Sequence, residues 1–369
     1  MLSNNVEAFL ALLRAGLWEK DVQLSRFEHI DYDEIYRLAK EQTVIGLIAA
    51  GLEHVTDCKV RKDVTITFVR EAAQLVQCNL SMNQFIGDLM RRTNQSGVEA
   101  LLVKGQGVAQ CYERPLWRAN GDVDLFLDEV NYLKAKELFR EIASSMRAEN
   151  KYTKHIGTMV GPWEVELHGN MRSRVTARID RVIDAVQADT FNNHKVRVWR
   201  NADTEVLIPS PDNDVIFVFT HILHHFYRGG IGLRQICDWC RLLYVYNDQI
   251  DRSVLKKRLE DAAIIPEWKL FGGLAVKHLG MPEDAMPLYE GQTKKIMPIL
   301  EYILEVGNFG HNRDGSYYRK NPFLIRKAIS LWRKSGDIFH HYMLFPANSF
   351  RYFCRFICNG ILTVAREIG

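Results

Sequence analysis

Two aspartates, Asp122 and Asp124, lie one residue apart in the otherwise apolar segment 122-DVDLFL-127. The alternation of polar and apolar residues predicts a strand, on which residues i and i+2 point to the same face. Val123 and Leu125 would then pack on the opposite face. Two carboxylates this close repel each other, so either one is protonated or a cation lies between them.

A third carboxylate has the same setting. Glu166 lies between Val165 and Leu167 in 163-WEVELHG-169, and His168 should point the same way. Neighbouring strands are about 4.8 Å apart, so Glu166 could join the aspartates if the two strands are adjacent. Carboxylate oxygens suit Mg²⁺ or Mn²⁺, and three carboxylates around such ions are typical of phosphoryl transfer. The alternative is an amphipathic strand whose acids are only solvated.

A glycine-containing turn precedes the aspartates. Lys104 and Gly105 follow the apolar strand candidate 101–103 and lead into a short helix. Such a turn presents backbone N–H groups, and the helix N-terminus adds positive potential, so phosphates bind there. An ordinary tight turn is the alternative. Arg114 and Arg118 lie on the loop before the aspartates and could reach phosphate oxygens, unless they are only solvated.

The elements that must position these residues fall into three segments: a helical region 1–95, an α+β core 96–209 and a helical domain 210–369. Mixed strands and helices in this order indicate an α+β fold. Helices are expected over about 60–92, 105–112, 131–146 and 177–187, and from Pro211 onward. Strands are expected over 100–103, 122–127, 152–160, 163–169, 195–199 and 204–208.

This order of elements is similar to the nucleotidyltransferase fold of the DNA polymerase β superfamily. More closely, 101-LLVKGQGVAQCYERPLWRANGDVDLFL-127 resembles a family of uncharacterised bacterial nucleotidyltransferases, whose members show Lys-Gly, Tyr, Pro, Arg and Asp-Ile-Asp-Leu. The family's downstream histidine matches His155, and its acid-hydrophobic-His strand matches 166–168. Its later helical motif matches 221–243, with His221, His225, Arg234 and Asp238. The resemblance covers about residues 98 to 245 in ordered pieces.

The resemblance implies a mixed β-sheet core flanked by helical regions, and a metal-dependent nucleotidyl transfer. Asp122 and Asp124 would hold the metal and the nucleotide phosphates, and Glu166 would hold a second metal and help to deprotonate the acceptor hydroxyl. The hydroxyl would attack the α-phosphorus of a nucleoside triphosphate, with ATP the expected one, and pyrophosphate would leave. The acceptor, whether a small molecule, a sugar or a protein, is not readable from the sequence.

The resemblance also implies a wider set of binding residues. Those expected near the nucleotide and its phosphates are Lys104, Gly105, Gln106, Arg118, His155 and His168, and those expected in the cleft are His221, Arg234 and Asp238. Gln106 stands where the superfamily usually has a serine that helps to hold the phosphates. A catalytically inactive nucleotide-binding or interaction module on the same fold is therefore the alternative function, and a helical scaffold with solvent-facing acids is a third.

Structural interpretations compete for the outer residues of this set. Each histidine could be a surface or core residue, and Arg234 and Asp238 could form an internal pair that joins two helices. A zinc site from His221, His225, Cys237 and Cys240 is conceivable by ligand type. Its spacing does not match a standard zinc module, and Cys-x-x-Cys in an apolar helix favours a core position.

Composition limits the function classes. A net charge of +3 over 369 residues gives no indication of a protein that coats nucleic acid, so nucleic acid is not an expected partner, although local basic patches can still occur. The sequence contains no run of about 18 apolar residues, so no membrane span is expected. The first residues read as an amphipathic helix and not as a signal peptide, and the seven scattered cysteines fit a reducing cytoplasm.

Two C-terminal features complete the expectations. Cys354 and Cys358, four residues apart in the last helix, are expected in an apolar core. The basic stretch 318-YRKNPFLIRKAISLWRK-334 is expected to be an amphipathic helix. A solvated face is favoured for it over contact with RNA or with an anionic lipid surface.

Overall fold

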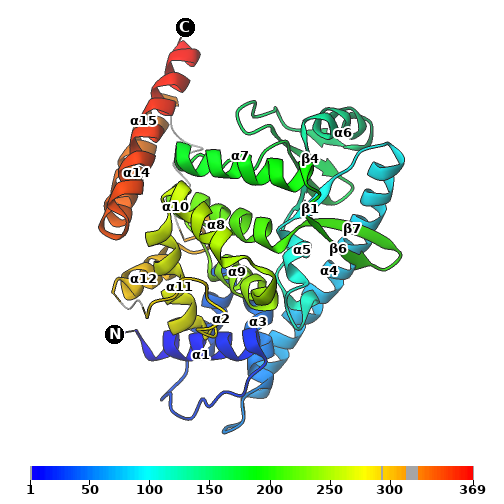
Figure 1. Ribbon diagram of the computed structural model, residues 1–369. Coiled ribbons are helices and arrows are strands. Elements are labelled where there is room, and N and C mark those ends of the chain that lie inside the picture. Colours follow the sequence, from blue (N-terminus) through cyan, green and yellow to red (C-terminus); the bar gives the residue numbers. More distant parts are fainter. Residues whose placement is uncertain (1, 292–293, 313–322, 369) are drawn as a thin grey trace.

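The computed structural model describes residues 2–291, 294–312 and 323–368 (Figure 1). Helices form its N-terminal part, as the apolar spacing predicts. They are α1 Asn4–Trp18, α2 Tyr32–Glu41, α3 Ile45–Glu53 and the long α4 Lys62–Gln95. The side chain of Ser3 caps α1, and that of Asp31 caps α2.

A mixed five-stranded sheet follows and confirms the α+β class. Its strands are β1 Leu101–Val103, β2 Val123–Phe126, β3 Ser145–Met146, β4 His155–Val160 and β5 Trp163–His168, in the spatial order β1-β2-β5-β4-β3. Strands β2 and β5 are parallel, and the other neighbouring pairs are antiparallel. Between the strands lie α5 Gly105–Ala109, the short 3-10 helix Pro115–Trp117 and α6 Glu129–Ile142.

The remaining elements are mostly helical. After α7 Ala177–Asn192, a separate antiparallel hairpin forms from β6 Val196–Asn201 and β7 Thr204–Pro209. The helices that follow are α8 Pro211–Arg228, α9 Leu233–Val245, α10 Arg252–Ala262, α11 Ile265–Leu279, α12 Ile296–Val306, α14 Phe323–Leu344 and α15 Pro346–Ile368.

One segment predicted to be helical contains a strand. The helix expected over 131–146 ends at Ile142, because Ala143 has an extended backbone. Ser145 and Met146 form the edge strand β3, which pairs with β4. Helix α7 continues five residues beyond the expected end at Gln187, and α5 ends three residues before the expected Tyr112.

Each face of the sheet packs against a different group of helices. Alternate strand residues such as Leu125 and Leu167 pack with apolar side chains from α4 and α6. On the other face, Phe126 contacts Phe191 of α7 and Phe217 of α8, with ring centroids 4.9 and 5.2 Å apart. The polar members of β2 and β5 share this second face, so the candidate site lies between the sheet and α8. The division at residues 95 and 209 stays a prediction.

The C-terminal expectations have mixed outcomes. Cys354 and Cys358 are exposed on α15, so their expected place in an apolar core is wrong. Of the basic stretch 318–334, residues 318–322 lie outside the described part, and the rest belongs to α14. Within the described residues, no helix has the length and apolar character needed to span a membrane.

Candidate active site

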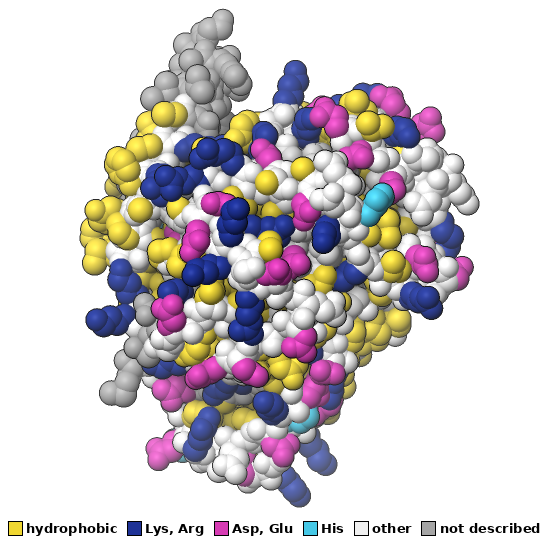
Figure 2. Space-filling model, viewed as in Figure 1, with side chains coloured by type: hydrophobic (Ala, Val, Ile, Leu, Met, Phe, Trp, Pro, Cys, Tyr) yellow, Lys and Arg dark blue, Asp and Glu magenta, His cyan; other side chains and the backbone are white. Residues whose placement is uncertain are grey.

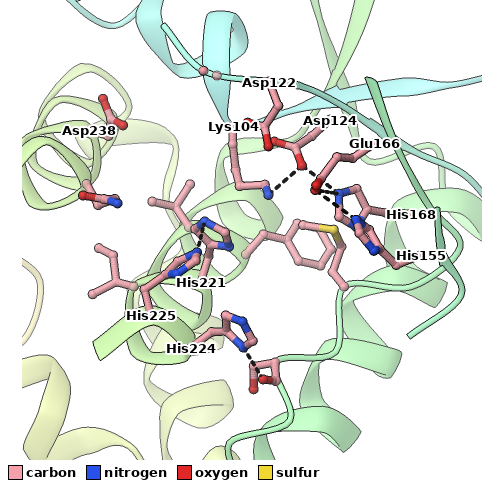
Figure 3. Close-up of a pocket in the computed structure, with 18 of the residues that line it drawn as sticks. Lys104, Asp122, Asp124, His155, Glu166, His168, His221, His224, His225 and Asp238 are labelled. Carbon is pink, nitrogen blue, oxygen red and sulfur yellow. Dashed lines mark hydrogen bonds and ion pairs between the residues drawn. The ribbon is translucent and has the colours of Figure 1, made fainter. Parts of the chain in front are cut away.

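Three carboxylates meet on the face of the sheet that points to α8 (Figure 3). The parallel pairing of β2 and β5 places Asp124 directly beside Glu166. Asp122 comes directly before β2, and one carboxylate oxygen from each of the three residues lies within 4.8 Å of the others. The sequence predicted that Glu166 joins the aspartates if the two strands are adjacent. The structure shows that they are adjacent.

Lys104 reaches this group from the end of β1. Its ammonium donates a hydrogen bond to Asp124 Oδ1 at 2.9 Å, and Asp124 is only 3% exposed. The backbone of Lys104 has φ 56° and ψ −143°, and Gly105 follows with φ 41°. A non-glycine residue in this conformation costs about 1–3 kcal/mol, and such strain is common at functional sites. The strained turn directs the Lys104 side chain to the carboxylates.

Two histidines on β4 and β5 contact the same carboxylates. The two residues lie opposite each other in the antiparallel register. His168 Nε2 is 2.7 Å from Asp124 Oδ1 and 3.4 Å from Glu166 Oε2. His155 Nε2 is 3.0 Å from the same Glu166 oxygen. The structure thus places both predicted histidines directly beside the carboxylates.

The charges of this group are unevenly balanced. Burial acts to raise the pKa of Asp124, but Lys104 and His168 lower it below its usual value. Burial likewise opposes the shift at Glu166, whose pKa is held far below its usual value by His155 and His168. The repulsion from Asp124 is the main cause that raises the pKa of Asp122 from 3.8 to about 6. Asp122 is therefore the carboxylate whose charge is least compensated.

This imbalance gives a pH-dependent stability prediction for Asp122→Asn in the presence of a chelator. A carboxyl whose folded pKa is raised destabilises the fold once it ionises. The variant should therefore have a higher melting temperature than the wild type above pH 6, and the gain should disappear below about pH 4. Thermal unfolding across this range measures it. A lower melting temperature of the variant at pH 8 would mean that Asp122 makes a stabilising contact that outweighs the repulsion.

The wall opposite the carboxylates consists of three histidines on α8 (Figure 3). His221 Nε2 and His225 Nε2 are 3.0 Å apart, and His224 Nδ1 contacts the backbone oxygen of Ser173. Burial is the main cause of a lowered pKa in all three, to about 4 for His224 and to about 2 for His225, and Lys104 adds to it. At neutral pH this wall offers uncharged hydrogen-bonding groups.

A buried ion pair lies beside the pocket. Arg118 Nε and Nη2 each donate to one carboxylate oxygen of Asp238 at 2.7 Å, and the Tyr112 hydroxyl donates to the same group at 2.7 Å. Asp238 therefore pairs with Arg118, and the expected internal pair of Asp238 with Arg234 is not the one formed. Arg118 lines the pocket, but its side chain is already engaged.

Arg234 forms no ion pair with a carboxylate within the part of the chain that the structure describes. Its Nη1 donates to the backbone oxygens of Ala119 and Asn120 at 3.0 and 3.2 Å, on the loop just before Asp122. Its buried Nε has no hydrogen-bond partner among the described residues. Burial and the nearby Arg118 lower the pKa of the Arg234 guanidinium. A buried guanidinium that lines the pocket, and that makes no hydrogen bond to a carboxylate among the described residues, is suited to an anionic ligand.

Two residues expected near the phosphates have other side-chain partners. The Gln106 side chain is buried, and its Nε2 donates to Asn79 Oδ1 at 2.7 Å, on α4. It is not among the described residues that line the pocket, so it does not replace the superfamily serine there. Arg114 is held by Glu53 and Glu19 at 2.6 and 2.9 Å.

The pocket between these walls has a volume of about 470 Å³. Sequence reasoning missed the loop that closes its far side, where Asn170, Arg172 and Arg174 contribute. The position of this loop in the sequence could have indicated its role, because it directly follows the strand that carries Glu166. Phe309 also lines the pocket, and its distance in sequence gave no signal.

The zinc alternative receives no support. Cys237 and Cys240 are fully buried in the helical core. Among the described residues, the groups that could hold a metal ion are Asp122, Asp124 and Glu166, and His155, Glu166 and His168. Neither group includes His221 or His225.

The carboxylate group fits Mg²⁺ or Mn²⁺ on two observations. Its donors are all carboxylate oxygens, which these hard ions prefer. The raised pKa of Asp122 reports a repulsion that a divalent cation would relieve.

The fold and this site define an α+β protein with a nucleotidyltransferase-type sheet and a carboxylate-lined pocket. The family profile described as "Uncharacterised nucleotidyltransferase" matches residues 28–276, about two thirds of the chain. The chain belongs to this family. The match includes α4, the whole sheet and the α8 and α9 walls of the pocket. No curated protein and no solved structure matches the chain.

Proposed function

We propose that this protein is a metal-dependent nucleotidyltransferase that moves a nucleoside monophosphate from a nucleoside triphosphate to an acceptor hydroxyl. The observation that carries the proposal is the side-by-side placement of Asp124 and Glu166 on parallel strands, with Asp122 completing the group. Family membership supports the reaction class. ATP as the donor, a bacterial origin, the superfamily placement and a cytoplasmic location stay predictions.

In this proposal the three carboxylates hold Mg²⁺ or Mn²⁺, which when bound offsets the negative charge of the phosphates. Lys104 lies beside Asp124 and would contact a phosphate oxygen while remaining close to that carboxylate. The Arg234 guanidinium would bind the phosphates that leave as pyrophosphate. The strained Lys104-Gly105 turn keeps the ammonium at the reacting end of the pocket.

The acceptor hydroxyl would approach Glu166. This carboxylate would accept a hydrogen bond from the hydroxyl and help to deprotonate it as the oxygen attacks the α-phosphorus. His155 and His168 hydrogen-bond the same carboxylate and would fix its orientation. The neutral histidines of α8 face this end of the pocket and would hydrogen-bond polar groups of the acceptor.

The role of Arg234 gives a separate prediction. Arg234→Gln should raise the Kd for Mg²⁺-bound nucleoside triphosphate and for pyrophosphate by roughly tenfold or more, since a charge-assisted hydrogen bond contributes about 1.5–3 kcal/mol. Isothermal titration calorimetry measures both values, and Arg234→Lys is the control that keeps the charge. An unchanged Kd together with a lower melting temperature would make Arg234 a support for the loop before Asp122 and nothing more.

The proposed reaction is tested by following radiolabel from ATP, GTP, CTP and UTP labelled at the α-phosphate into a metabolite and protein extract. Metal-dependent transfer of the α-label, with release of pyrophosphate, is the expected result. Parallel assays use ATP labelled at the γ-phosphate. Transfer of the γ-label alone would show a kinase and contradict the proposal.

One observation favours the second candidate, a catalytically inactive nucleotide-binding or interaction module. The Gln106 side chain bonds Asn79, so it supplies no donor where the superfamily uses a serine. This candidate predicts metal-dependent nucleotide binding without transfer of label to any acceptor.

A further inference from the structure

Helices α14 and α15 form a hairpin along one edge of the molecule, and the C-terminal end of α15 extends away from the other helices (Figure 1). The hairpin is anchored near its turn, where Leu344, Phe345 and Tyr352 are buried in the helical core. Arg355 on α15 adds an ion pair to Asp180 on α7 at 2.8 Å. The hairpin is therefore attached on one side, which leaves its other side open.

The open side of α14 carries a row of large exposed apolar side chains, which we call the apolar stripe. Ile325, Trp332, Phe339 and Met343 are 48, 78, 67 and 60% exposed. Their spacings of seven, seven and four residues place them within about 40° of one line along a helix with 3.6 residues per turn. His341 and Leu344, which are buried, lie on the opposite side.

Helix α15 continues the exposure at the turn. Phe350 is 62% exposed, and Cys354 and Cys358 follow it at four-residue spacing on the same side of that helix. Figure 2 shows hydrophobic side chains gathered along the edge formed by the hairpin, with Lys and Arg side chains next to them. Exposed apolar residues that are scattered singly need no explanation, but several large ones aligned on one side of a helix mark an interaction site.

The hairpin also concentrates positive charge. The segment 323–368 contains seven Lys and Arg residues and two acidic ones, a formal net charge of +5. The whole chain has a net charge of only +3, so the remainder is slightly acidic. Large apolar side chains along one side of a basic helix of about 20 residues are characteristic of helices that lie in the plane of a membrane surface.

We propose that the α14–α15 hairpin binds an anionic lipid surface, with the apolar stripe of Ile325, Trp332, Phe339 and Met343 inserted among the lipid headgroups. Charge complementarity selects this occupant. A second copy of the hairpin would bring two segments of charge +5 together and is repelled. RNA would satisfy the charge but not the aliphatic part of the stripe. The proposal does not depend on the proposed transfer reaction.

The test is sedimentation of the full-length protein with vesicles of phosphatidylcholine alone and of phosphatidylcholine with phosphatidylglycerol. The expected partition coefficient is roughly tenfold or more higher on the anionic vesicles, since each basic residue near such a surface contributes about 1 kcal/mol. Raising the salt concentration should reduce it. Trp332→Ser/Phe339→Ser should lower binding to the anionic vesicles at least tenfold, without a change in melting temperature.

The matched control is Val130→Ser/Leu133→Ser, which removes two exposed apolar side chains from α6. It should bind like the wild type. The proposal is overturned if the wild type does not sediment with anionic vesicles, or if the α14 variant binds them as well as the control does. It is also overturned if the α14 variant instead converts a wild-type dimer into a monomer, which would identify a second copy as the occupant. If the wild type binds RNA but not vesicles, and the α14 variant no longer binds RNA, the partner of the stripe is RNA.

Discussion

Asp124→Asn is expected to reduce metal-dependent nucleotidyl transfer by at least about a hundredfold, because loss of even an outer-shell partner of a metal site costs about 10–100-fold. Asp124 is the most buried of the three carboxylates and contacts both Lys104 and His168. The asparagine keeps the shape of the side chain but loses the charge that would hold the cation and orient these two groups. Initial rates with the α-labelled nucleotide measure the effect.

Two features make this experiment decisive. The substitution leaves the Lys104 ammonium without its 2.9 Å carboxylate partner, so some stability will be lost and rates must be referred to the folded fraction. Asp203→Asn is the control, since Asp203 is an exposed aspartate that contacts Arg91 and lies outside the pocket. Wild-type activity in Asp124→Asn, with the same metal requirement, would remove the carboxylate group from the mechanism.

Arg118→Met is expected to lower the free energy of unfolding by about 3–5 kcal/mol, the usual cost of removing one partner of a buried ion pair. Arg118 and Asp238 are 5 and 6% exposed, and their two hydrogen bonds are both 2.7 Å long. The methionine would leave a buried Asp238 carboxylate with the Tyr112 hydroxyl as its remaining side-chain contact among the described residues. Urea unfolding followed by circular dichroism measures the loss.

The double variant Arg118→Met/Asp238→Leu should recover most of this stability, because it removes both charges. Arg178→Met is the control at an exposed arginine and should change stability by less than about 0.5 kcal/mol. If Arg118→Met is as stable as the wild type but no longer binds nucleotide, Arg118 is a phosphate-binding residue, as the sequence alone suggested, and the ion pair is incidental.

The carboxylate group could be predicted because its signal is local. Alternation with period two places Asp124 opposite to Val123 and Leu125, and the same pattern orients Glu166 and His168. The adjacency of the two strands is not encoded in either segment. The register of β2 with β5 depends on how the apolar faces of both strands pack against α4 and α6, and no local pattern encodes that choice.

The outer residues of the site could not be predicted because their partners are far away in the sequence. Gln106 binds Asn79, 27 positions earlier, and Arg118 binds Asp238, 120 positions later. Composition gives the types of these residues but not which polar groups satisfy each other on burial. The prediction that Cys354 and Cys358 lie in an apolar core was wrong. An apolar helical pattern does not reveal which side of the helix packs against the rest of the protein.

The proposed function requires that the carboxylate group binds a metal ion and a nucleotide. The most direct test measures the melting temperatures of the wild type and of Asp122→Ala/Asp124→Ala with Mg²⁺ or Mn²⁺ and each nucleoside triphosphate. Binding to the folded state alone raises its stability by about 2.7 kcal/mol at a hundredfold excess over Kd. A rise in melting temperature that requires both metal and nucleotide, and that the double variant lacks, is the predicted result. No rise with any nucleotide, or an equal rise in the double variant, would contradict the account.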